Sequence, residues 1–125
     1  MTTSEPTNIG LSERAHARLK RLKEDGHFKE MVDAYRFGIA LALAQGVVPP
    51  EITATTVFGV ATVDPDQTLK NAIQTILGDK VEGIAVYKMA ERLADWGVNE
   101  LADQATMGEI DFVTIFDQLQ AASNK

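Results

Sequence analysis

The sequence contains no cysteine, which excludes disulfide bonds, a thiolate nucleophile and zinc or iron–sulfur sites built on cysteine. Histidine is scarce: His16 and His27 are the only two, and both are expected to be exposed and structural rather than members of a catalytic triad. Residues 1–6 have neither a basic flank nor an apolar core, so no secretory signal is expected and the predicted location is the cytoplasm.

Common catalytic and nucleotide-binding motifs are absent as well. The chain has no GxGxxG, GxxxxGK, GxSxG or HExxH pattern, and no spacing ties a pair of carboxylates to an apolar pocket. We therefore expect a protein that is not an enzyme, with no metal, no cofactor and no small-molecule substrate. Carboxylates that are distant in the sequence can still converge in the fold, which leaves the enzymatic alternative open.

The net charge of −6 is unevenly distributed along the 125 residues. Residues 1–46 hold seven Lys and Arg against six Asp and Glu, a balance of +1, whereas residues 47–125 hold five against twelve, a balance of −7. Nonspecific nucleic-acid binding depends on positive charge, so the acidic total argues against a protein that coats DNA. A local basic face remains compatible with an oriented nucleic-acid contact, with head-to-tail contact between copies, or with a basic partner.

A basic amphipathic helix is predicted over residues 13–24, because Ser12 is a good N-cap and no helix breaker follows before Gly26. Its narrow apolar stripe has the spacing i, i+4, i+7: Ala15, Leu19 and Leu22. Cations lie on both sides of the stripe and in the next turn, and they are the candidate nucleic-acid or partner contacts: Arg14, Arg18, Lys20, Arg21, Lys23 and Lys29. These cations form either a solvated face that shields the stripe or a phosphate-facing surface.

A second helix is predicted over residues 28–45, ended by Gly46. Its second half is apolar on every side, with no charge between Arg36 and Glu51, so it must be buried on every side. The apolar run is too short to span a membrane, which leaves a central core helix or the seam of a homodimer. A homodimer is expected, and the seam is predicted to use apolar and small residues that permit close helix crossing: Ala34, Phe37, Gly38, Leu41 and Ala42.

Shorter elements are predicted for the acidic half. A β-prone run gives a strand near residues 55–60, which pairs either with a second copy or with a strand at residues 8–11. Asp64 to Gln67 form a capping box for a helix that stops at Gly78. Three further segments have helical spacing, the first with Gly97 as its C-cap and the last capped by Asp111: residues 84–96, 98–106 and 112–119.

The expected fold class is therefore mainly α, with about six helices around a central apolar helix and one or two short β-strands. Residues 1–7 are expected to be a disordered tail, and residues 8–125 a single domain. Within this domain, residues 8–46 form a strand–helix–helix unit and residues 51–125 supply an acidic strand and the remaining helices.

The strand–helix–helix order, with Leu11, Ser12 and Glu13 at the junction, resembles the ribbon-helix-helix DNA-binding unit over residues 7–46, and is similar in outline to DndE-like DNA-sulfur-modification proteins. The resemblance implies that strands of two copies pair and enter the major groove through residues around Asn8 and Gly10. It also implies that the turn between the helices meets phosphate, through Gly26, His27 and Lys29. Because the strand holds no Arg or Lys, the resemblance supports a dimeric fold element more than base readout.

Two functions follow from these patterns. The first is a noncatalytic accessory or regulatory protein of a DNA-transaction system, which contacts nucleic acid or a DNA-bound partner through the basic helix face. The alternative is a protein–protein interaction module, in which the acidic half engages a basic partner and nothing contacts nucleic acid. DNA affinity at two salt concentrations separates the two, because phosphate contacts weaken steeply as salt rises.

Overall fold

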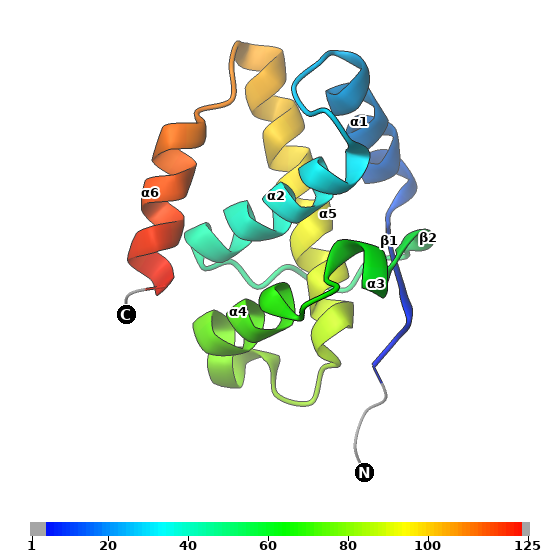
Figure 1. Ribbon diagram of the computed structural model, residues 1–125, viewed down its shortest axis with the longest axis vertical. Coiled ribbons are helices and arrows are strands. Elements are labelled where there is room, and N and C mark those ends of the chain that lie inside the picture. The colour runs from blue at the N-terminus through cyan, green and yellow to red at the C-terminus, as the bar shows by residue number, and fades with distance from the viewer. Residues whose placement is uncertain (1–4, 124–125) are drawn as a thin grey trace.

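The structure is a computed structural model that describes residues 5–123. Within this range the chain is mainly helical, with six α-helices, one 3-10 helix and one antiparallel pair of strands (Figure 1), which confirms the predicted fold class. The elements in chain order are β1 Asn8–Leu11, α1 Glu13–Glu24, α2 Met31–Gln45, β2 Thr55–Gly59, α3 Val60–Val63, α4 Thr68–Leu77, η1 Gly78–Val81, α5 Val86–Met107 and α6 Phe112–Ser123. None of the helices in the described range is both long and apolar enough to cross a bilayer.

Helices α2 and α5 cross at the centre of the fold, and α1 and α6 lie on opposite sides of this pair (Figure 1). The crossing is close because glycines meet there: a Cβ atom built on Gly97 of α5 would lie 1.9 Å from the carbonyl oxygen of Gly38. The close helix crossing predicted for Gly38 is confirmed. Its partner, however, is a helix of the same chain.

The residues predicted to form a seam between two copies lie inside the single chain. Ala34, Leu41 and Ala42 are 0–2% exposed, and Gly38 is buried against α5. Phe37 is half-buried and contacts two aromatic rings of α6. Because α5 and α6 cover the apolar circumference of α2, its burial requires no second copy.

Strand β1 takes its partner from the same chain. It pairs antiparallel with β2, and a β-bulge follows Ile9, where Gly10 packs so close to Thr55 that a Cβ atom would lie 1.7 Å from the Thr55 carbonyl oxygen. The strand at residues 8–11 and its pairing with the later strand are therefore confirmed. The resemblance to ribbon-helix-helix units implies pairing with a second copy instead, and in this structure β2 occupies that position.

Two carboxylates of α5 hold the backbone at the end of β1. Glu91 Oε2 accepts a hydrogen bond from the N–H of Gly10 at 2.8 Å, and Asp95 Oδ2 accepts one from the N–H of Ser12 at 2.8 Å. Both acids are less than 10% exposed. The two hydrogen bonds take the place of bonds to water that a carboxylate loses when it is buried. The strand is thus fixed to the central helix pair as well as to β2.

The predicted helix end at Gly97 is wrong. Helix α5 runs through this position to Met107, so the segments predicted over residues 84–96 and 98–106 form one helix. Glycine is favoured both at helix ends and where two backbones approach closely, and here the contact with Gly38 accounts for it.

Two predicted helix starts are also shifted. Helix α2 begins at Met31 rather than Phe28, whose ring instead packs against α2 and α6. Helix α4 begins at Thr68, and Asp64 caps it from across a turn by accepting hydrogen bonds from the N–H groups of Leu69 and Lys70 at 2.9 and 3.0 Å. Asp64 is a capping residue as predicted, although it is not adjacent to the helix.

Part of the predicted N-terminal tail contacts the body of the protein. Residues 1–4 of the expected tail lie outside the described residues, but Glu5 caps α5 by accepting hydrogen bonds from the N–H groups of Val86 and Tyr87, both at 3.0 Å. The carbonyl oxygen of Thr7 accepts one from Val60 at 2.8 Å. Glu5 and Thr7, which belong to the expected tail, are thus bonded to the body of the protein.

Candidate interaction surface

Helix α6 is fixed to the body of the protein by aromatic contacts. Phe37 of α2 meets Phe112 and Phe116 of α6 edge to face, with ring centroids 5.0 and 5.3 Å apart. Phe28 adds a second edge-to-face contact to Phe112 at 5.7 Å, and Ile115 is buried. Such pairs contribute about 0.5–1.5 kcal/mol each beyond the apolar area that they bury. Helix α6, which covers the helix predicted over residues 112–119, therefore packs against α2.

The outer face of α6 leaves large apolar side chains in water. Val113 is 72% exposed and Phe116 is 56% exposed, and the two are neighbours one helical turn apart. We call this pair the α6 patch. Met107, at the end of α5, is 90% exposed. Part of the Phe116 ring is covered, where it contacts Phe37.

The surroundings of the α6 patch are acidic. Between Arg92 and Lys125 the sequence has no Lys or Arg but six Asp and Glu. Three of these acids are exposed in or next to α6, and we call them the acidic rim: Glu109, Asp111 and Asp117. Hydrogen bonds from the backbone and then the hydroxyl of Thr114 lower the pKa of Asp111, which keeps that carboxyl ionised.

An apolar groove lies beside the α6 patch, between α2, α4 and α6. It has a volume of about 350 Å³, and its apolar lining comes from all three helices: Phe37 and Ala40, Leu69, and Ile115 and Phe116. Phe116 therefore borders both the groove and the outer face. We call this cavity the α6 groove.

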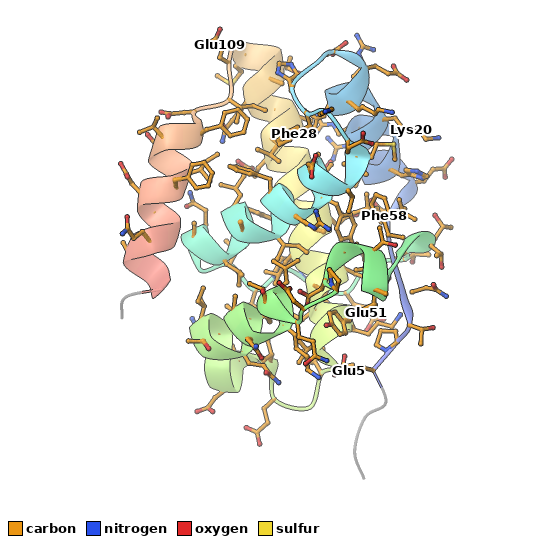
Figure 2. The ribbon with its side chains drawn as sticks, viewed as in Figure 1. Glu5, Lys20, Phe28, Glu51, Phe58 and Glu109 are labelled. Carbon is orange, nitrogen blue, oxygen red and sulfur yellow. The ribbon has the colours of Figure 1, made fainter. Side chains whose placement is uncertain are left out.

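The cations predicted as contact residues are mostly on the surface of α1. Among the described residues, Arg14, Lys20, Lys23 and Lys29 are exposed and form no ion pair within 4.0 Å. Figure 2 labels Lys20 on α1, and Glu109 at the end of α5 that leads to α6. The cations of α1 lie among exposed acids, which are Glu13, Glu24, Asp25 and Glu30.

Two of the predicted contact residues form ion pairs within the chain. Arg18 donates hydrogen bonds to the carbonyl oxygen and Oδ1 of Asn99 at 3.1 and 3.2 Å, and it forms an ion pair of 2.8 Å with Asp103. Arg21 pairs with Asp25 at 3.1 Å. Arg18 thus joins α1 to α5, and these bonds give it a structural role.

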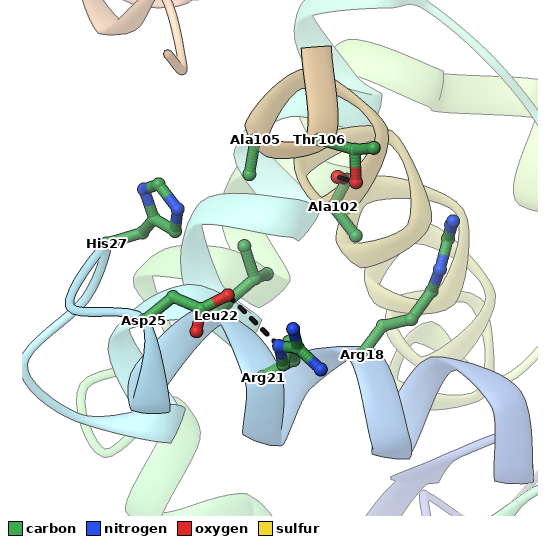
Figure 3. Close-up of a pocket in the computed structure, with 8 residues that line it drawn as sticks. All are labelled: Arg18, Arg21, Leu22, Asp25, His27, Ala102, Ala105 and Thr106. Atoms are coloured by element: carbon green, nitrogen blue, oxygen red, sulfur yellow. Dashed lines mark hydrogen bonds and ion pairs between the residues drawn. The ribbon is translucent and has the colours of Figure 1, made fainter. Parts of the chain in front are cut away.

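A cavity of about 450 Å³ opens beside these arginines, between the ends of α1 and α5 (Figure 3). Arg18, Arg21 and His27 lie on its wall, together with Asp25. Both arginines already have a carboxylate partner, so the cavity has little uncompensated positive charge to offer an anion. In the part of the chain that the structure describes, no group of three or more His, Asp or Glu residues could hold a metal ion.

No family model, curated protein or solved structure matches this chain. The surface is therefore interpreted from its own geometry. Sequence patterns missed Val113, whose position follows from its 100° offset from Phe112 on the α6 helix. They also missed the buried carboxylates Glu91 and Asp95, whose backbone partners lie 81 and 83 residues away in the chain.

Proposed function

We propose that this protein is a noncatalytic protein–protein interaction module that engages a basic partner through the α6 patch and the acidic rim. One observation carries the proposal: Val113 and Phe116 are exposed on one face of α6, in a stretch of chain that contains acids and no Lys or Arg. Burying exposed apolar surface against a partner contributes about 25 cal/mol per Å². The carboxylates beside it favour cationic partners and speed their encounter.

The arrangement also explains why copies of the protein would not pair through this face. A two-fold contact of α6 with α6 brings the same residues together, so the acidic rims of both copies would repel each other. The expected partner is therefore a different protein, with apolar side chains among Lys or Arg.

Binding of a synthetic amphipathic peptide of Leu and Lys tests the proposal. Fluorescence anisotropy at physiological salt should detect binding to the wild-type protein, and should detect none for a matched peptide of Leu and Glu. Val113→Lys should weaken binding by about tenfold or more, because it removes an apolar contact and adds a like charge. Val48→Lys is the matched control, since Val48 is exposed outside α6 and both variants have the same net charge. Equal binding by the two variants, or no binding by the wild-type protein, refutes the proposal.

A nucleic-acid contact through α1 is the second candidate function. It is supported by Arg14, Lys20 and Lys23, which are exposed without ion-pair partners among the described residues, and by Lys29 in the next turn. Such a surface contacts phosphate, or the acidic patch of a DNA-bound partner, and suits an accessory protein of a DNA-transaction system. It would lie on the side of the molecule opposite α6 (Figure 1).

DNA affinity at low and moderate salt tests this second function. The logarithm of the affinity should fall with the logarithm of salt, by a slope of about 0.9 for each phosphate contacted. Lys23→Glu should reduce the affinity, whereas Lys80→Glu, an equal charge change on an exposed lysine of η1, should have little effect. The absence of binding at low salt rules out the nucleic-acid contact.

A further inference from the structure

We infer that the α6 groove receives one large apolar side chain of the basic partner, so that the partner is an amphipathic segment with an apolar anchor beside Lys or Arg. This inference rests on the proposed function, and it adds where the partner binds and what chemistry the partner has. Phe37 and Ala40 line the groove from α2, Leu69 lines it from α4, and Phe116 lines it from α6. Three helices far apart in the sequence thus converge on one open apolar cavity.

The size of the groove sets the size of its occupant. A volume of about 350 Å³ is near the lower limit for sites that enclose drug-sized molecules, about 300–1,000 Å³. It is suited to one or two side chains rather than to an entire helix. The remaining residues of the partner would lie along the outer face of α6, across Val113.

Acidic side chains in and near the groove favour a basic neighbour for the anchor. Asp33 is part of the lining, and the exposed Asp117 follows Phe116 in α6. A smaller cavity of about 300 Å³ continues the groove past Leu69 to Asp66. Contacts with Thr68, from its side chain and its backbone N–H, lower the pKa of Asp66, so it is ionised at neutral pH.

Arg36, the cation among the described residues that line the groove, is already engaged by the protein. Arg36 donates hydrogen bonds to the carbonyl oxygens of Val63 and Thr62 at 2.8 and 2.7 Å, and it lies 3.6 Å from Asp33. Its charge is therefore balanced inside the chain. An approaching segment meets the exposed carboxylates of Asp66 and Asp117, which form no ion pair within 4.0 Å among the described residues, and these give the charge complementarity that a basic partner requires.

A second copy of the chain cannot supply this occupant through its own basic helix. The apolar side chains of α1 are buried beneath it, since Ala15, Leu19 and Leu22 are each at most 2% exposed. An anionic membrane surface is equally unsuitable, because the acidic rim would be repelled by its negative potential. A basic, amphipathic protein segment remains as the occupant.

Filling the groove tests the inference with the same Leu and Lys peptide. Ala40→Met places a larger apolar side chain on the wall of the groove and should weaken peptide binding by about tenfold, the effect of losing one anchor contact. Ala17→Met is the matched control, because Ala17 is exposed on α1, far from α6 (Figure 1), and binding should be unchanged. Circular dichroism verifies that both variants remain folded.

The two proposals fail in different ways. Wild-type affinity in Ala40→Met, together with weak binding in Val113→Lys, would overturn the groove and leave the α6 patch as the docking surface. Wild-type affinity in Val113→Lys would refute the proposed function itself, as would a lack of peptide binding by the unaltered protein. A peptide in which Ala replaces Leu should also lose binding. If it binds as well as the Leu peptide, no apolar anchor is involved and the groove inference is wrong.

Discussion

Burial changes the pKa of both tyrosines of the chain. Tyr35 is fully buried, and its hydroxyl donates a hydrogen bond to the carbonyl oxygen of Gly10 at 3.0 Å. Burial raises the pKa of Tyr35 well above its usual value, and the nearby charges of Glu91 and Asp95 raise it further. Burial also raises the pKa of Tyr87 to about 12, with help from the hydrogen bond that its hydroxyl donates to Asp64.

We expect the folded protein to resist tyrosine ionisation. Because both pKa values are raised in the folded state, the neutral phenols stabilise the fold below the unfolded pKa of about 10, and this contribution is lost as the pH rises through the folded values. Phenolate absorbance should therefore reach half its maximum near pH 10 in urea-unfolded protein, but remain low at that pH in the folded protein. Identical titration curves for both states would contradict the burial of Tyr35 and Tyr87.

Replacing the buried carboxylate of Glu91 should lower the free energy of unfolding more than replacing a partly buried carboxylate of the same helix. Glu91→Ala leaves the buried N–H of Gly10 without its acceptor, and hydrogen bonds to charged groups contribute about 1.5–3 kcal/mol. We expect the free energy of unfolding in urea to fall by about that amount. Glu100→Ala is the control, since Glu100 lies on the same helix and is only partly buried. A loss of the same size in both variants would mean that Glu91 does not hold β1.

At the scale of helices, α2 and α5 can approach closely because Gly38 and Gly97 have no side chains where the two helices cross. Gly97→Ala would normally stabilise a helix interior by about 1 kcal/mol, because Ala has the higher helix propensity. Here we expect the opposite sign, a loss of about 1–3 kcal/mol from overpacking, since the new Cβ would lie 1.9 Å from the Gly38 carbonyl oxygen. Urea unfolding measures the change.

The other glycine of the crossing provides a graded comparison. A Cβ atom on Gly38 would lie no closer than 3.0 Å to its nearest neighbour, the backbone nitrogen of Val98. Gly38→Ala should therefore destabilise the protein less than Gly97→Ala. If Gly97→Ala instead stabilised the protein, the two helices would have to lie further apart than in this structure.

Local signals predicted most elements correctly, and tertiary contacts account for the errors. The strand at residues 8–11, the helix over residues 13–24 and the end of α4 at Gly78 depend on neighbouring residues, and all three are confirmed. Gly97 was misinterpreted because the residue that explains it, Gly38, is remote in the sequence. The α6 groove was not predicted for the same reason, since its lining comes from α2, α4 and α6.

For the whole molecule, the uneven charge of the sequence becomes a separation in space. The cations of α1 that form no ion pair among the described residues lie on one side of the central helix pair, and α6, which lies next to the acidic rim, is on the other (Figure 1). Arg18 links the two halves through its ion pair with Asp103 of α5. A contact on one surface therefore leaves the other surface accessible, so the two candidate functions do not compete for the same residues.

The homodimer prediction depends on how the apolar surface of α2 is covered. The sequence predicted a homodimer because one small chain seemed unable to bury that surface, but α5 and α6 do so here. We therefore expect light scattering to give the mass of one chain, 13.6 kDa, at both low and moderate salt. Repulsion between acidic rims should oppose pairing through the exposed apolar side chains of α6, most strongly at low salt.

Twice that mass at all salt concentrations would contradict this expectation and revive the predicted homodimer. Pairing through Val113 and Phe116 should then be abolished by Val113→Lys but not by Val48→Lys, because only the first of these apolar residues lies in the α6 patch. A dimer that persisted in both variants would have to use another face, such as α1. The α6 patch would in that case remain free for a basic partner, and the peptide-binding results would be unaffected by the oligomeric state.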